Sequence, residues 1–153
     1  MYMAERKQTG SPEHFHELTT QAIKHYDACF LKFGMRSCVY NVSLYHDVFP
    51  ITLRASLYSV HLRDWLNVFP KKQLMIIKAE DYYSDRLHVL NEAFRFLDIS
   101  NLSSTASNFV QTRRPSNQMK YSPMFSSSKE LLDVFFKPLN KHLEHILERK
   151  FWS

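Results

Sequence analysis

The chain has 153 residues, 44% of them hydrophobic and 23% charged, and its 20 Lys and Arg exceed its 15 Asp and Glu to give a formal charge of +5. This composition suits one globular domain and excludes a mainly disordered chain. Only two glycines occur, Gly10 and Gly34, and they are too far apart in sequence for a Walker A loop or a GxSxG nucleophile elbow, while a GxGxxG loop needs three.

The first half of the chain carries helical patterns. Ser11 and Pro12 predict a helix start, and apolar residues at helical spacing continue to Gly34, a suitable C-cap. A short helix is expected from residue 35 to about 45. A broadly apolar helix is expected from Pro50 to Phe69, where Pro70 ends it.

The run 73–78 is short, apolar and rich in isoleucine, which predicts a buried strand of the parallel kind. One strand cannot form a sheet, so its partners lie outside this chain or in another subunit, or the fold is almost all α. Glu80 and Asp81 follow the strand, where ligands often bind. Capping of the next helix or pairing with a base is the alternative that we favour for them.

The second half is predicted to hold two helices around a loop. Ser84 or Asp85 can cap a fourth helix that reaches Leu97, and a polar stretch from 98 to 127 predicts a long loop. Ser128 is expected to cap the last helix, 129 to about 150, with a break or kink near Pro138.

Three cations in that loop, Arg113, Arg114 and Lys120, could hold a phosphate or a sulfate, because guanidinium groups match such anions bidentately. A solvated loop is the ordinary alternative. No basic run is long enough for a nucleic-acid tract, so no nucleic-acid partner is expected. The apolar run 74–77 is far shorter than a membrane span, and residues 1–10 lack a signal-peptide core, so a membrane anchor would have to lie upstream.

Eight histidines occur without an HExxH pattern, and we expect surface histidines rather than a metal site. His61 could be a general base, although a role in the core or at its rim is more usual. Cys29 and Cys38 could form a disulfide in an oxidising compartment or remain two buried thiols in the cytosol. Glycosylation sequons begin at Asn41 and Asn101.

Residues 53–99 hold an ordered pattern: a helix with the Leu57-Tyr58 pair and Trp65, then a strand, then Glu80, then a helix that ends in Phe96-Leu97. In this pattern the chain resembles the Golgi carbohydrate sulfotransferases. The resemblance spans about 2–152 and is strongest to the chondroitin-type subgroup that adds 6-O-sulfate to N-acetylgalactosamine 4-sulfate. The segments that fit this subgroup are 36–41, 108–115 and 136–140.

The resemblance implies a P-loop-like α/β fold, of which this chain would be the mostly helical C-terminal part with few strands. It implies transfer of sulfate, without a metal, from 3′-phosphoadenosine 5′-phosphosulfate to a hydroxyl of a chondroitin- or dermatan-type glycosaminoglycan in the Golgi lumen. For the nucleotide it implies contacts from Arg113, Arg114 and Lys120, and it fits a luminal disulfide between Cys29 and Cys38. The sequons make Asn41 and Asn101 the expected glycosylation sites.

The family's phosphate-cradling loop, catalytic base and 3′-phosphate residues have no match in this sequence. Residues 1–153 are therefore expected to be a partial sulfotransferase domain that lacks the N-terminal donor-binding loop and has negligible activity alone. Two alternatives stay open. One is a non-catalytic remnant that binds sulfated glycans or serves as a scaffold, and the other is a cytosolic all-α interaction module unrelated to sulfation.

Overall fold

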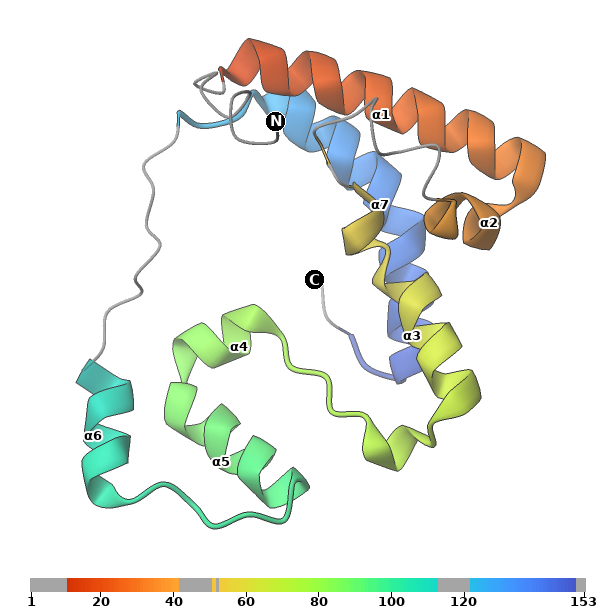
Figure 1. The fold of residues 1–153 in the computed structure, drawn as a ribbon. Coiled ribbons are helices and arrows are strands. Elements are labelled where there is room, and N and C mark those ends of the chain that lie inside the picture. Colours follow the sequence, from red (N-terminus) through yellow and green to blue (C-terminus); the bar gives the residue numbers. More distant parts are fainter. Residues whose placement is uncertain (1–10, 42–50, 52, 113–121, 151–153) are drawn as a thin grey trace, which may run out of the picture. The chain divides into compact units, whose positions relative to one another are not determined.

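The computed structural model describes residues 11–41, 51, 53–112 and 122–150, and these residues form helices and no strand (Figure 1). They belong to two compact units, one made of 1–65 with 121–153 and the other of 66–120. The elements in chain order are α1 (Pro12–Phe33), α2 (Met35–Tyr40), the 3₁₀ turn η3 (Leu53–Ser56), α3 (Tyr58–Val68), the 3₁₀ turn η4 (Lys71–Gln73), α4 (Ala79–Ser84), α5 (Arg86–Phe96), α6 (Ser104–Thr112) and α7 (Ser126–Leu147).

Both ends of α1 follow the sequence prediction. The Ser11 hydroxyl accepts a hydrogen bond from the backbone N–H of His14 at 3.2 Å, and Pro12 occupies the first turn. At the other end the N–H of Gly34 donates to the Phe30 carbonyl at 3.0 Å. Gly34 has a φ of 76°, a backbone conformation that residues with a side chain rarely adopt. A Cβ added here would meet no other atom within 4 Å, so the backbone angle and not crowding favours glycine. This turn directs the chain from α1 straight into α2.

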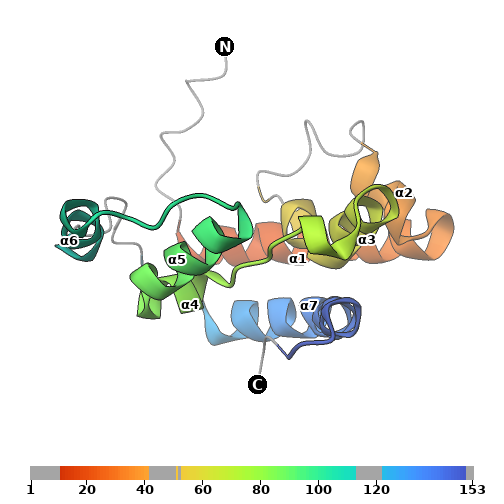
Figure 2. The same ribbon diagram turned by 90° about the horizontal axis from the view of Figure 1, so that it is seen from below.

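The core of the first unit lies between α1 and α7, which run side by side in the same direction (Figure 1, Figure 2). The rings of Tyr26 and Phe30 on α1 lie 6.1 and 6.3 Å from the ring of Phe135 on α7. The buried side chains that form this core are Ala22, Ile23, Tyr26, Val39, Leu53, Leu57, Val60, Phe135 and Leu139. Helix α2 and the segment from η3 into α3 therefore close the same core.

Two helix predictions for this unit need correction at their ends. The helix expected from residue 35 to about 45 ends at Tyr40, and 42–50 lie outside the described residues. The helix expected from 50 to 69 is divided into η3 and α3 by Leu57. Leu57 is completely buried, so the chain turns around a core side chain at the point where a continuous helix was expected.

Helix α7 differs from the prediction at its start. It begins at Ser126, and Ser128 does not cap it. The fully buried Ser128 hydroxyl instead lies 2.8 Å from His16 Nδ1 and joins the N-terminal turns of α7 and α1. The helix runs unbroken through Pro138 to Leu147, and it bends rather than breaks (Figure 1).

The second unit contains α4, α5 and α6. Asp85 caps α5 as predicted, because its side chain accepts from the His88 N–H at 3.0 Å. Arg86 at the start of α5 reaches the Val110 carbonyl of α6 at 3.4 Å. Helix α6 was not predicted, since the polar composition of 98–127 indicated a loop. Its N-terminus is nevertheless capped by Ser103, whose hydroxyl accepts from the Ala106 N–H at 3.3 Å.

The predicted strand at 73–78 is wrong for the described residues. Gln73 ends η4, and the backbone is extended at Leu74, with φ and ψ of −117° and 117°. A strand needs a neighbour for its backbone hydrogen bonds, and the described parts of the chain offer none. The apolar side chains of Ile76 and Ile77 consequently remain 37% and 44% exposed.

The second unit buries little of its hydrophobic side-chain surface. Val89 is its one buried hydrophobic side chain among the residues that the structure covers, while Leu97 and Phe109 are each 60% exposed. No helix in the described ranges is long and apolar enough to cross a membrane. Most of the hydrophobic stabilisation of these residues therefore resides in the first unit.

Candidate functional site

The predicted anion-binding residues Arg113, Arg114 and Lys120 lie outside the described residues. Glu80 and Asp81 do not follow a strand but occupy the first turn of α4, where carboxylates favourably meet the helix dipole. Their location agrees with the structural role that we favoured for them. The polar groups that the structure does bring together lie on α2, α3 and α7 of the first unit.

A disulfide between Cys29 and Cys38 links α1 to α2, with their Cα atoms 6.0 Å apart. Both cysteines are buried, and the loop between them contains the Gly34 turn. The bond therefore fixes the short helix α2, whose six residues have little helical stability of their own, against the end of α1. Of the two forms that the sequence left open, the structure has the oxidised pair.

Helix α2 brings Arg36 and Tyr40 to Asp64 on α3. Arg36 Nε lies 3.0 and 3.1 Å from the two carboxylate oxygens of Asp64, and its guanidinium lies 5.3 Å from the centre of the Tyr40 ring. The hydrogen bond from Arg36, and then the one from Tyr40, lowers the pKa of Asp64 below its ordinary value. The same carboxylate raises the pKa of Tyr40. This network joins α2 to α3 beside the disulfide.

His61 also belongs to this junction. Its Nε2 lies 3.1 Å from the Arg54 carbonyl oxygen, which can only accept, so Nε2 carries a proton and donates. Its Nδ1 lies 3.3 Å from the Tyr40 hydroxyl, and the two rings meet edge to face. Both ring nitrogens face protein partners, so the geometry favours the structural role of His61 over a general base.

The Asp64 network predicts a pH effect that Asp64→Asn removes. Because the folded pKa of Asp64 is depressed, its carboxylate stabilises the fold at neutral pH, and this contribution is lost as the pH falls through that pKa, below about pH 4. Thermal unfolding followed from pH 6 to pH 3 should show a steeper fall of Tm in the wild type than in Asp64→Asn. The matched variant Asp27→Asn should follow the wild type, and parallel curves for all three proteins would contradict the network.

A second polar contact joins α3 to α7. The Arg63 guanidinium donates to Nε2 of His142, and His145 follows one turn later on α7. The pKa of His142 is lowered by burial first, and then by the nearby charges of Arg63 and His145. This pair brings basic side chains of two different helices into contact.

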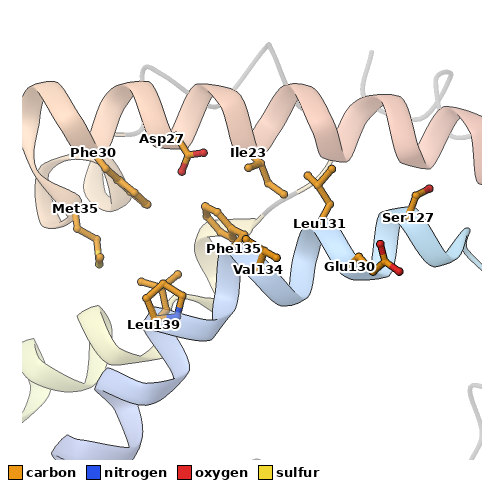
Figure 3. A pocket seen from close by; sticks show the side chains of 11 residues that line it. Ile23, Asp27, Phe30, Met35, Ser127, Glu130, Leu131, Val134, Phe135 and Leu139 are labelled. Carbon is orange, nitrogen blue, oxygen red and sulfur yellow. The ribbon is translucent and has the colours of Figure 1, made fainter.

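A groove of about 550 Å³ lies between α1 and α7 (Figure 3). Its walls are mostly apolar, with Phe30 and Phe135 directed into the space between the helices, and Asp27 and Glu130 add one carboxylate from each helix. Its lining has one hydroxyl, that of Ser127, and no histidine or cysteine. Among the described residues no group of His, Cys, Asp or Glu could hold a metal ion. The groove thus suits packing better than bond-making chemistry.

Comparison with known proteins assigns the chain to a family. Residues 14–145 match the family described as Sulfotransferase domain. The chain belongs to the sulfotransferase family. Carbohydrate sulfotransferase 15 of Mus musculus is 35% identical over 144 residues, which are 90% of this chain and 25% of that protein. The chain thus spans about a quarter of the length of that relative. The alternative of an interaction module unrelated to sulfation does not fit this membership.

Two further relatives support the assignment. Carbohydrate sulfotransferase 15 of Nototodarus sloanii is 34% identical over 140 residues, or 88% of this chain and 87% of that protein. The Membrane-associated sulfotransferase kil1 of Dictyostelium discoideum is 37% identical over 99 residues, or 65% of this chain and 20% of that protein. No solved structure is a significant match to this sulfotransferase chain. Proteins of the family use 3′-phosphoadenosine 5′-phosphosulfate as sulfate donor.

The polar contacts on α3 could not be found from the sequence. Arg36 and Asp64 are 28 residues apart, and Arg63 and His142 are 79 residues apart, so no local motif signals either pair. The one available signal is that Arg63 and Asp64 are the two charged residues of α3. Both side chains prove to contact other helices.

Proposed function

We propose that these residues form part of an enzyme that transfers sulfate from 3′-phosphoadenosine 5′-phosphosulfate to a hydroxyl of a chondroitin- or dermatan-type glycosaminoglycan. The observation that carries the proposal is the match of 14–145 to the sulfotransferase domain, together with 35% identity to a carbohydrate sulfotransferase. In this proposal the chain supplies part of the nucleotide site and part of the glycan cleft.

The proposed nucleotide contacts are Arg113, Arg114 and Lys120. Phosphate and sulfate oxygens are strong acceptors, and arginine can bind two of them at once through its planar fork. These three cations fall within eight residues ahead of α7, and two are adjacent arginines. They would neutralise phosphate charge on the donor rather than take part in proton transfer.

Sulfate transfer requires more than these cations. A base must accept the proton of the sugar hydroxyl, and donors must surround the sulfuryl group as charge develops. With two glycines the sequence has no glycine-rich phosphate loop, and the His61 ring nitrogens are both engaged by protein groups. We therefore propose that the 153-residue chain alone has negligible transferase activity.

The direct test is a transfer assay with radiolabelled 3′-phosphoadenosine 5′-phosphosulfate and chondroitin 4-sulfate. The purified chain should give no labelled polysaccharide above the no-enzyme background, while a complete carbohydrate sulfotransferase in the same buffer serves as the positive control. Labelled product from the chain alone would contradict the proposed inactivity. Failure to bind both the donor product adenosine 3′,5′-bisphosphate and chondroitin sulfate would contradict the proposed function itself.

A non-catalytic role in binding sulfated glycans is the second candidate, and the missing glycine-rich loop favours it. Affinity for chondroitin sulfate that needs no nucleotide, and that weakens in the double variant Arg113→Ala and Arg114→Ala, would support this role over the enzyme.

The proposed location is the Golgi lumen. The Cys29–Cys38 disulfide requires an oxidising compartment to persist, and the sequon residues Asn41 and Asn101 are both exposed. Glycosidase-sensitive mass at these two asparagines in protein from its native source is the expected result.

A further inference from the structure

The contact between Arg63 and His142 places two basic side chains from different helices against each other. Arg63 lies on the exposed side of α3, and the described residues offer its guanidinium no partner besides His142. A guanidinium has five N–H donors in a fixed plane, so most of its donors stay available to a ligand. His145 is exposed one turn further along α7 and adds a third basic group at the same junction.

Among the described residues, no carboxylate pairs with Arg63 or acts on the charge of His142. Arg63 and His145 are the charged groups that act on His142, and both disfavour its protonated form, as does burial. Asp64 follows Arg63 in sequence, but its two oxygens are bound by Arg36 Nε on the neighbouring helix α2. Surface arginines in folded proteins commonly pair with acids, and this one pairs with a histidine instead.

We propose that Arg63, His142 and His145 form a binding site for a sulfate group of a sulfated glycosaminoglycan, and that the site binds more tightly when His142 is protonated. The choice of a glycan sulfate as the ligand rests on the proposed function. Binding of an anion does not, because any tetrahedral oxyanion offers the same acceptor oxygens.

The protonation chemistry follows from the geometry. His142 must be neutral to accept the Arg63 hydrogen bond at Nε2, since a protonated imidazole has no acceptor nitrogen. A sulfate ester remains an anion throughout the physiological pH range and accepts from both side chains at once. Its charge offsets the repulsion between Arg63 and a protonated His142, so binding and proton uptake support each other. Affinity should therefore increase as the pH falls.

Two sources of oxyanion can be separated by the choice of ligand. The sulfate of a glycan and the phosphates of the nucleotide donor share the same acceptor chemistry. Residues 113–120, which we propose for the nucleotide, are a separate segment of the sequence. We therefore assign the α3–α7 junction to the glycan.

The experiment measures binding of a chondroitin 4-sulfate oligosaccharide, its desulfated counterpart and adenosine 3′,5′-bisphosphate to the purified chain at pH 7.5 and 5.5. The variants are Arg63→Gln, which removes the cation, and the pair His142→Gln with His145→Gln, which keeps polar side chains but removes the titration. Lys24→Gln, an exposed lysine on α1, is the matched charge control, and His14→Gln is the histidine control.

The expected results are specific to the sulfated oligosaccharide. Arg63→Gln should weaken binding of the sulfated oligosaccharide about fivefold, because it removes one exposed, charge-assisted hydrogen-bonding contact. Lys24→Gln should leave this binding unchanged. The wild type and His14→Gln should bind the sulfated oligosaccharide about threefold more tightly at pH 5.5 than at pH 7.5. The double histidine variant should bind it equally at the two pH values. Desulfated chondroitin should bind weakly to every variant.

Three results would overturn the site. Equal loss of affinity in Arg63→Gln and Lys24→Gln would show that only overall charge matters. An unchanged pH effect in the double histidine variant would exclude the histidines. An Arg63→Gln effect confined to adenosine 3′,5′-bisphosphate would assign the anion to the nucleotide. In all three cases glycan binding by the wild type would leave the proposed function intact, whereas a wild type that binds neither ligand would contradict that function.

Discussion

Leu57→Ala is expected to lower the free energy of unfolding of the first unit by about 3–5 kcal/mol. Leu57 has no exposed surface and lies in the core formed by α1, α2, α3 and α7. Truncation removes buried methyl groups and leaves a cavity, which in helical cores costs about 2.7–5 kcal/mol for leucine. Leu57 also sits between η3 and α3, so the loss affects the packing of both. Urea unfolding followed by far-ultraviolet circular dichroism measures the change.

Leu31→Ala supplies a matched control for this prediction. Leu31 lies on α1 of the same unit but is 91% exposed, so the identical substitution removes almost no buried surface. Its effect should stay within about 0.5 kcal/mol. Similar unfolding midpoints for the two variants would contradict the position of the core.

Removing the disulfide with Cys29→Ala and Cys38→Ala together is expected to cost about 2–3 kcal/mol of stability. Closing a loop of nine residues restricts the unfolded chain by about this amount at room temperature. The bond also holds α2, so its loss should loosen the contact between Arg36 and Asp64. Hydrogen exchange in 35–40 should increase more than exchange in the centre of α1.

Reductant provides the control for this second prediction. The wild type should lose the same stability in a reducing buffer, while the double alanine variant should be insensitive to reduction. Equal stability of the wild type in oxidising and reducing buffer would mean that the bond does not constrain the fold.

Local chemistry explains which elements the sequence predicted correctly. The Ser11 cap, the Gly34 turn and the Asp85 cap each depend on atoms within a few residues, so the sequence contains the whole interaction. Ser128 looked equally suited as a cap, but its hydroxyl bonds to His16, 112 residues away. The composition of 98–127 concealed α6, although Ser103 supplied a local cap.

Elements that depend on distant partners were beyond such reasoning. The strand at 73–78 was predicted from its apolar run, but a strand exists only with a neighbour to accept its hydrogen bonds. The contacts of Arg36 with Asp64 and of Arg63 with His142 likewise depend on how α2, α3 and α7 pack. Family membership could be predicted from the sequence, because a resemblance depends on the order of residue types and not on their contacts.

The most direct test of the account is calorimetric titration of the purified chain with adenosine 3′,5′-bisphosphate. The account predicts measurable binding that weakens at least tenfold in the double variant Arg113→Ala and Arg114→Ala, because two charge-assisted contacts to phosphate are removed. The double variant Lys71→Ala and Lys72→Ala, which loses the same charge from another adjacent basic pair, should bind like the wild type. Equal affinity of all three proteins, or no binding by the wild type, would contradict the proposal that this chain carries part of a sulfotransferase donor site.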